Sequence, residues 1–158
     1  MDKDFSQLAT NESINKAKDA MIKNGITVLV AENGAEAKEI VLQMIPEKSE
    51  VMNMTSATID TIGLAQEINK SGKYDSVRNK LVEMSRLSED NRGSSTAKLS
   101  GQKLGAAPDW TVGSVHAVTE NGKIIIASAT GSQLPAYAYG SSHVVWVVGS
   151  QKIVKDLD

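Results

Sequence analysis

The chain has 158 residues, of which 41% are hydrophobic and 23% charged, and its formal net charge is −2. This length and composition predict one globular domain with a real core and exclude a disordered chain. A net charge this small gives no overall field favouring nucleic acid or an anionic membrane. With no cysteine, disulfides, cysteine-ligated zinc and an iron–sulfur cluster held by this chain are excluded.

The N-terminal sequence and the hydropathy pattern predict a soluble cytoplasmic protein. Residues 1–5 are Met-Asp-Lys-Asp-Phe, which is charged and lacks the apolar run of a secretory signal. The longest apolar stretch has about five residues, far below the roughly 20 needed to cross a bilayer. We therefore expect neither a membrane span nor a leader.

The first third of the chain predicts helix and strand in alternation. Apolar residues at helical spacing predict helices over residues 11–24 and 34–45, and Pro46 ends the second. Between them, the continuous apolar run 26–31 predicts a strand covered on both faces. Residues 50–54 predict a second, weaker strand. This alternation is typical of right-handed crossovers and a parallel sheet.

The middle of the chain is less regular. Residues 55–58 lead into a predicted helix that stops near Gly72, and residues 75–86 fit a further helix. Residues 88–108 are rich in Ser, Gly, Lys and Asn, so they predict a long loop that is either functional or disordered. Its basic side chains suit an anionic ligand or a solvated loop: Arg92, Lys98 and Lys103.

The clearest local signal is the hairpin around Asn121-Gly122. Two apolar runs flank this dipeptide, and a tight primed turn needs the positive φ angles that it tolerates. Residues 133–139 then predict a short helical connector, and residues 143–149 predict a buried strand. Residues 155–158 resemble the first turn of another helix, so we expect that a helical tail is missing.

The first candidate site is the turn between the 50–54 strand and its helix. Free backbone N–H groups at such a turn attract anions. The hydroxyls of Thr55, Ser56 and Thr58 can add hydrogen bonds. Ordinary helix capping by Ser or Thr, with Asp60 in the first turn, explains the same residues. The turn lacks the glycine-rich sequence of a phosphate cradle.

The second candidate site is His116 with Glu120. On one strand His116, Val118 and Glu120 would share a face. A Glu beside a His can act as a nucleophile or a general base. The alternative is a solvated hairpin Glu and a His satisfied within its strand.

A polar loop and the two histidines complete the candidates. Thr130, Gly131 and Ser132 could close over a ligand at the carboxyl end of the sheet, where open α/β folds bind, or form a plain connection. The separation of His116 and His143 fits no short ligand motif, so no metal site is predicted.

Three segments resemble the LUD (lactate-utilisation) domain family. Residues 55–63, Thr-Ser-Ala-Thr-Ile-Asp-Thr-Ile-Gly, are similar to the family's Ser-x-Thr…Gly turn. Residues 104–120 resemble a second family segment, from Leu-Gly-Ala-Ala-Pro-Asp-Trp to His-Ala-Val-Thr-Glu. Residues 136–149, followed by Gln-Lys-Ile-Val at 151–154, resemble the last strand and its Lys-Ile-Val. The resemblance extends from about residue 10 onward, and family members usually continue past residue 158.

The resemblance implies a fold like that of ribose-5-phosphate isomerase, glucosamine-6-phosphate deaminase and CoA transferases. That fold is a three-layer α/β/α domain with a mainly parallel sheet, here with one antiparallel hairpin, over residues 1–158. Those proteins bind anionic sugar phosphates or CoA esters near loops equivalent to residues 55–58. The resemblance therefore favours an anion site at this turn.

The resemblance also implies an association with lactate utilisation. We expect a small anionic metabolite or a nucleotide-like ligand at the carboxyl edge of the sheet. Thr55, Ser56 and Thr58 would hold the anion, His116 and Glu120 would line the pocket, and residues 130–132 would close it. The expected partners are this ligand, iron–sulfur proteins of lactate oxidation and a second copy of the chain.

Two alternatives stay open, and with them whether the protein is an enzyme. Residues 120–122, Glu-Asn-Gly, resemble the Ser-Glu-Asn-Gly motif whose Glu is the nucleophile in one class of CoA transferases. Thr119 stands here in place of that Ser, and His116 where other branches of the superfamily have Asp. The other alternative is a non-catalytic subunit of an iron–sulfur lactate-oxidation complex.

Overall fold

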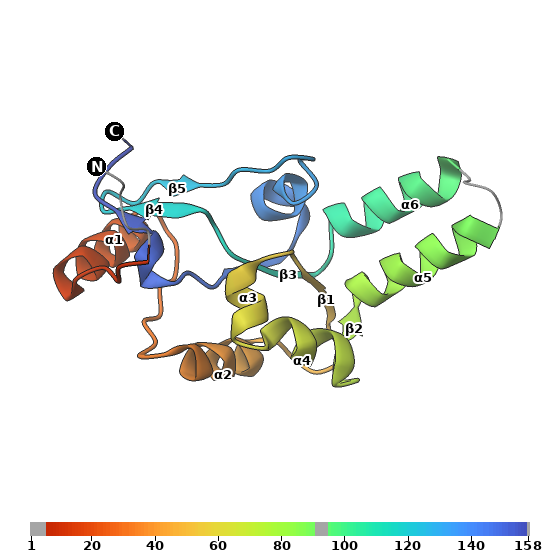
Figure 1. The fold of residues 1–158 in the computed structure, drawn as a ribbon, viewed down its shortest axis with the longest axis horizontal. Coiled ribbons are helices and arrows are strands. Elements are labelled where there is room, and N and C mark those ends of the chain that lie inside the picture. Colours follow the sequence, from red (N-terminus) through yellow and green to blue (C-terminus); the bar gives the residue numbers. More distant parts are fainter. Residues whose placement is uncertain (1–5, 91–94, 158) are drawn as a thin grey trace.

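The computed structural model describes residues 6–90 and 95–157, without the side chains of residues 87–90 and 95–98. Figure 1 shows short central strands with helices around them. In chain order the elements are α1 (Asn11–Lys23), α2 (Gly34–Met44), β1 (Glu50–Asn53), α3 (Ala57–Thr61), α4 (Leu64–Lys70), β2 (Asp75–Ser76), α5 (Val77–Asp90), α6 (Ser95–Ala106), β3 (Trp110–Gly113), β4 (Ala117–Thr119), β5 (Ile124–Ile125), the π-helix η1 (Ala136–Gly140), β6 (His143–Trp146), the 3₁₀ helix η2 (Ser150–Lys152) and β7 (Ile153–Val154).

Two sheets organise these elements. The four strands of the larger sheet are parallel and lie in the order β2-β1-β3-β6. The smaller sheet has the order β5-β4-β7, with β4 antiparallel to β5 and parallel to β7. This confirms the α/β class with a mainly parallel sheet, and the predicted hairpin forms around Asn121-Gly122.

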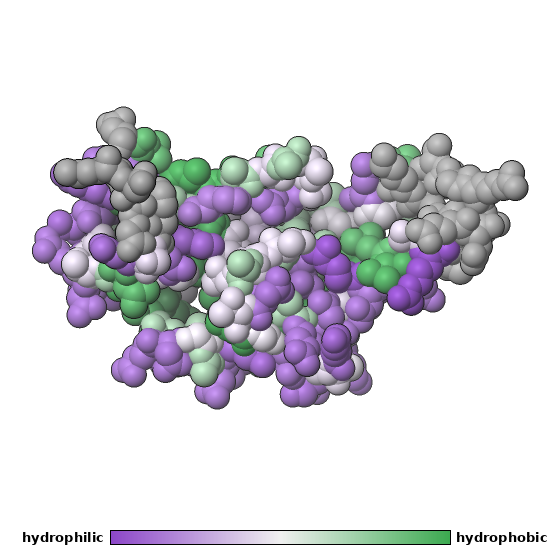
Figure 2. Space-filling view, in the orientation of Figure 1, coloured by the Kyte–Doolittle hydropathy of each residue, from purple (hydrophilic) through white to green (hydrophobic). Residues whose placement is uncertain are grey.

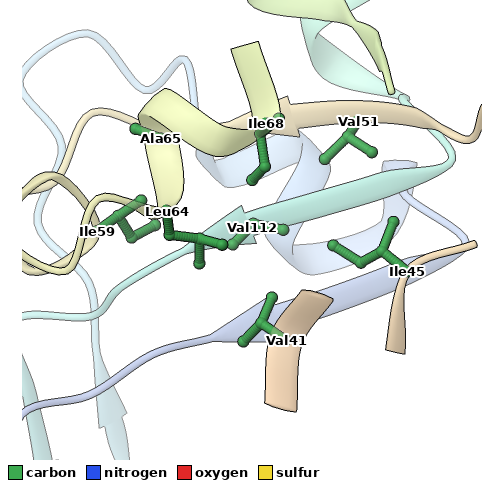
Figure 3. Close-up of a cluster of buried hydrophobic side chains, with 8 residues drawn as sticks. All are labelled: Val41, Ile45, Val51, Ile59, Leu64, Ala65, Ile68 and Val112. Atoms are coloured by element: carbon green, nitrogen blue, oxygen red, sulfur yellow. The ribbon is translucent and has the colours of Figure 1, made fainter. Parts of the chain in front are cut away.

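Helices cover both faces of the larger sheet because neighbouring strand residues point to opposite sides. On one face, Val51 and Val112 pack against α2, α3 and α4 in a cluster of fully buried aliphatic side chains. On the other face, Met52 packs with η1, the start of α5 and Leu104 of α6. Figure 3 shows the first cluster, which joins Val41, Ile45, Val51, Ile59, Leu64, Ala65, Ile68 and Val112. Each fully buried Val, Leu or Ile contributes roughly 1.5–3 kcal/mol.

The chain order creates a switch point in the larger sheet. From β1 the chain passes through α3 and α4 to β2 on one side, and the other neighbour of β1 is β3. The register pairs Asn53 at the end of β1 with Val112 near the end of β3. Open parallel sheets bind ligands outside the carboxyl ends of strands at such a point.

The helix predicted after residue 58 is divided at Gly63. This residue has φ +69° and caps the start of α4, so α3 and α4 are separate helices rather than one. The left-handed backbone is open to glycine and costs other residues about 1–2 kcal/mol. A break of this kind leaves no mark in apolar spacing, because Ile59 and Ile68 still reach the same core cluster.

We expect Gly63→Ala to destabilise the fold by about 1–2 kcal/mol, measured by urea denaturation. An added Cβ would meet only the flexible end of Lys38, at 3.6 Å, so the loss comes from the backbone and not from a clash. Asn tolerates the left-handed region better than Ala, so Gly63→Asn is the control and should lose less free energy of unfolding. Equal losses for the two variants would contradict this explanation.

The sequence predictions were wrong at residues 155–157, which form no helical turn, and in two longer segments. Residues 26–31 form no strand, and Leu29 and Val30 are 59% and 55% exposed. An apolar run forms a strand only where a neighbouring strand pairs with it, and none of the strands that the structure describes pairs with residues 26–31.

The other incorrect prediction for a longer segment is the loop at residues 88–108, since α6 covers Ser95–Ala106 and packs against α5. Gly101 and Gly105 suggested a loop, but they lie against Leu81 of α5, where a Cβ would stand 3.3 and 3.8 Å from its methyl groups. Lys103 is exposed on α6. Arg92 and the side chain of Lys98 lie outside the described residues.

The surface around these helices includes apolar side chains. In Figure 2 an apolar area lies over the α5–α6 pair, the two helices that carry the exposed Val82 and Leu99.

The strand predicted at residues 143–149 forms over His143–Trp146, but it lies at the edge of the sheet and is half-buried. Within residues 6–90 and 95–157, every helix falls short of the length and apolar character that crossing a bilayer requires.

Candidate functional site

Polar side chains gather where β1 and β3 end side by side. A backbone hydrogen bond from Met54 N to Val112 O, at 2.8 Å, holds the exit of β1 against β3. The turn into α3 follows β1, and Ser114 and Val115 follow β3. Lys152 reaches the same place from η2. We name Thr55, Thr58, Ser114, Val115 and Lys152 the β1–β3 corner.

Lys152 is at the centre of the corner. Its Nζ donates to Thr58 Oγ1 at 3.0 Å, to Ser114 Oγ at 2.8 Å and to the Val115 carbonyl at 2.9 Å. These bonds use all three ammonium protons, and every acceptor is neutral. Among the described residues, no salt bridge neutralises Lys152. Burial lowers the pKa of Lys152.

Two hydroxyls lie beside Lys152, and both accept from its ammonium group. Each oxygen accepts a proton from the ammonium group, which leaves the hydroxyl's own proton available. The distances from Ser114 Oγ to Thr58 Oγ1 and to the Val115 carbonyl are 3.5 and 3.4 Å, long for O–H···O bonds. A cation behind a hydroxyl strengthens the bond that the hydroxyl donates. The corner therefore presents two polarised donors and one positive charge.

Tyr137 of η1 fixes the loop that carries Ser114. Its hydroxyl donates to the Ser114 carbonyl at 3.2 Å, and its ring packs edge-on against Trp146 of β6 at 5.6 Å. Burial raises the pKa of Tyr137 to about 12, so the hydroxyl keeps the proton that it donates. The ring lies against Gly113, where a Cβ would stand 2.6 Å from Cζ.

The predicted anion turn lies at this corner. Thr58 accepts from Lys152, and Thr55 Oγ1 accepts from Arg78 Nη2 at 3.2 Å. Ser56 is the N-cap of α3 but makes no side-chain capping bond. The turn hydroxyls are therefore not explained by ordinary helix capping. With only five residues in α3, the positive charge here comes from side chains.

The side chains of Glu120 and His116 have partners outside the corner, although His116 directly follows Val115. Glu120 Oε1 accepts from Ser13 Oγ at 2.7 Å, and Oε2 lies 3.6 Å from Lys16 Nζ, both on α1. In Figure 1 the hairpin formed by β4 and β5 lies beside α1, and α3 is away from it. His116 is exposed, and its Nδ1 accepts from Ala127 N at 3.2 Å. His116 precedes β4 and Glu120 follows it, so of the predicted face only the buried Val118 is on the strand.

The predicted closing loop is held by its own short bonds. Thr130 Oγ1 donates to Ser132 Oγ at 2.9 Å, and Gly131 N donates to Ser128 Oγ at 3.0 Å. Gly131 has φ +71°, and both Thr130 and Ser132 are exposed. In the part of the chain that the structure describes, none of these side chains bonds to the β1–β3 corner.

Sequence reasoning missed Lys152, Ser114 and Arg78 as site residues. Lys152 and Ser114 stand inside the segments that resemble the LUD family, which is the signal that could have singled them out. Arg78 has no such signal. Within the described ranges there is no group of three or more His, Asp or Glu side chains that could hold a metal ion.

The fold and the corner define an α/β protein with a polar, positively charged site at the switch point of a parallel sheet. The LUD domain family matches residues 14–158, so the chain belongs to this family. Membership supports a protein associated with lactate utilisation. No curated protein and no solved structure matches the chain.

Proposed function

We propose that the protein binds a small anionic metabolite or a nucleotide-like ligand at the β1–β3 corner. The observation that carries the proposal is Lys152, whose three protons rest on neutral acceptors while its charge has no acidic partner among the described residues. Partly removing a cation from water costs free energy unless an opposite charge compensates it. An anion at the corner supplies that charge.

The contacts of the ligand follow from the hydrogen bonds already formed. Thr58 and Ser114 accept from Lys152, and each keeps a hydroxyl proton that we propose it donates to the ligand. Phosphate and carboxylate oxygens accept such bonds, and a charged acceptor makes them stronger than neutral ones. Thr55 and Ser56 add hydroxyls along the same turn. Residues 130–132 remain the proposed closing loop.

We favour binding over acyl transfer through Glu120 because that carboxylate is bound to Ser13 and Lys16 of α1. Acyl-CoA incubation followed by borohydride trapping and mass spectrometry distinguishes the two functions. We expect no modified Glu120, and a trapped Glu120 thioester would reverse the preference.

We retain iron–sulfur proteins of lactate oxidation as proposed partners. Co-purification that persists when Ser114→Ala weakens ligand binding would indicate a separate, structural role.

The direct test is a binding panel of inorganic phosphate, CoA esters and lactate, measured by calorimetry and thermal shift. We expect at least one anion to raise the melting temperature at millimolar concentration. Ser114→Ala should weaken the binding of that anion about tenfold, since a hydrogen bond to a charged group contributes roughly 1.5–3 kcal/mol. Ser142→Ala, at an exposed serine, is the control and should bind like the unmodified chain. A panel without any binding would refute the proposal.

A further inference from the structure

A second cation lies at the other end of the turn. Arg78, near the start of α5, donates from Nη2 to the Asn53 carbonyl at 2.8 Å and to Thr55 Oγ1 at 3.2 Å. It forms no salt bridge with any residue that the structure describes. Lys80 on the same helix is different, because it pairs with both Glu50 and Asp75. Arg78 therefore keeps an unneutralised charge where β1 ends.

The chemistry at Arg78 repeats that at Lys152. In both places a cation donates to a threonine hydroxyl and leaves the hydroxyl proton free: Lys152 with Thr58, and Arg78 with Thr55. Arginine has five N–H donors in a planar fork, and a single nitrogen is used here. The remaining donors suit the bidentate recognition of a carboxylate or a phosphate.

The spacing of the two hydroxyls limits the size of the ligand. Thr55 and Thr58 are three residues apart, so their Cα atoms are separated by at most about 11 Å. One small molecule can reach both. A monocarboxylate such as lactate occupies one of the two places and leaves the other cation uncompensated.

An unpaired acceptor lies beside the same turn. Asn53 is 5% exposed, and its Oδ1 is buried without a hydrogen-bond partner within the described chain. Its backbone carbonyl is the group that Arg78 binds. A buried oxygen without a donor costs free energy. A hydroxyl group on the ligand that reached this oxygen would supply the missing donor.

We infer that the β1–β3 corner has two anion subsites, Lys152 with Thr58 and Arg78 with Thr55, for a small hydroxylated metabolite with two anionic groups. This inference rests on the proposed function, because the first subsite is the anion site proposed above. It adds the second subsite and the class of ligand.

The test compares three ligands by calorimetry. 3-Phosphoglycerate has a phosphate and a carboxylate, glycerol 3-phosphate has the phosphate alone, and lactate has the carboxylate alone. We expect 3-phosphoglycerate to bind at least tenfold more tightly than either of the others. Arg78→Met should weaken the binding of 3-phosphoglycerate about tenfold and the binding of the other two ligands less than threefold. Arg86→Met, an exposed arginine on the same helix, makes the same change of charge and should alter none of them.

The possible failures can be told apart. Equal affinity for all three ligands, or an equal loss for all three in Arg78→Met, overturns the second subsite and leaves the proposed function standing. No binding of any ligand overturns both. If Arg78→Met does not fold by circular dichroism, Arg78→Lys keeps the charge without the fork. It should then reduce the preference for 3-phosphoglycerate, and an unchanged preference counts against the inference.

Discussion

Replacing Lys152 with methionine is expected to weaken phosphate binding at the β1–β3 corner about 30-fold. The substitution keeps an unbranched side chain one atom shorter but removes the charge and the three donated bonds. Thr58 and Ser114 are then free to donate to each other or to water, so they no longer face an anion as polarised donors. Such a loss corresponds to about 2 kcal/mol. Calorimetry with inorganic phosphate measures it.

Lys155→Met is the matched control for that experiment. Lys155 is exposed and lies three residues further along the chain. Its substitution therefore changes the net charge by the same amount without touching the corner. We expect less than a twofold change in phosphate affinity. If the two variants bind phosphate equally well, Lys152 is not the anion-binding cation.

The same substitution gives a pH signature. Burial lowers the pKa of Lys152 below its ordinary value of 10.5 in the folded state. Between the lowered pKa and 10.5 the unfolded chain binds more protons, so the free energy of unfolding rises with pH in that window. Lys152→Met should lose this rise. Lys16 and Lys80, whose pKa values are raised, contribute equally to both proteins and cancel. Urea unfolding from pH 8 to 11 measures the difference, and parallel profiles would contradict it.

Gly113→Ala is expected to destabilise the fold by about 3 kcal/mol, because overpacking a filled core forces side chains and backbone to move. The new Cβ would stand 2.6 Å from Cζ and 2.9 Å from Cε1 of Tyr137, and still nearer its hydroxyl. The ring cannot turn away easily, since its hydroxyl binds the Ser114 carbonyl and its edge meets Trp146. Urea denaturation gives the change in unfolding free energy.

A double variant identifies the clash as the cause. Tyr137→Phe should not rescue Gly113→Ala, because ring carbons as well as the hydroxyl lie too close. Tyr137→Ala removes the ring, so Gly113→Ala combined with Tyr137→Ala should cost less than the sum of the two single changes. Additive losses would place the effect in the backbone of β3 instead.

The fold was predictable from sequence where local spacing decides it. The 11–24 and 34–45 helices, the 50–54 strand and the Asn121-Gly122 hairpin need only nearby residues. The strand prediction for residues 26–31 was wrong because a strand also needs a partner strand, and an apolar pattern does not reveal whether one pairs with it. The loop prediction for residues 88–108 was wrong for a related reason. Gly101 and Gly105 suggested a loop, but in this fold they allow α6 to approach Leu81.

The sequence predicted the position of two residues of the candidate site but not its cations. Thr55 and Thr58 follow a strand of a parallel sheet, and that position alone points to a binding edge. The cations are set by contacts over long sequence distances. Thr58 and Lys152 are 94 residues apart, and Thr55 and Arg78 are 23 residues apart. Side chains this far apart are brought together by the sheet order β2-β1-β3-β6 and by the return of the chain at η2, which single-sequence patterns do not specify.

The wide sequence separation within the corner has a consequence for the order of assembly on the ribosome. Thr58 emerges early, Ser114 follows, and Lys152 comes 94 residues after the threonine that it binds. A nascent chain can begin to bury its aliphatic side chains before Lys152 has been added, because that cluster ends at Val112. The proposed anion site is thus completed only after the aliphatic cluster has begun to form.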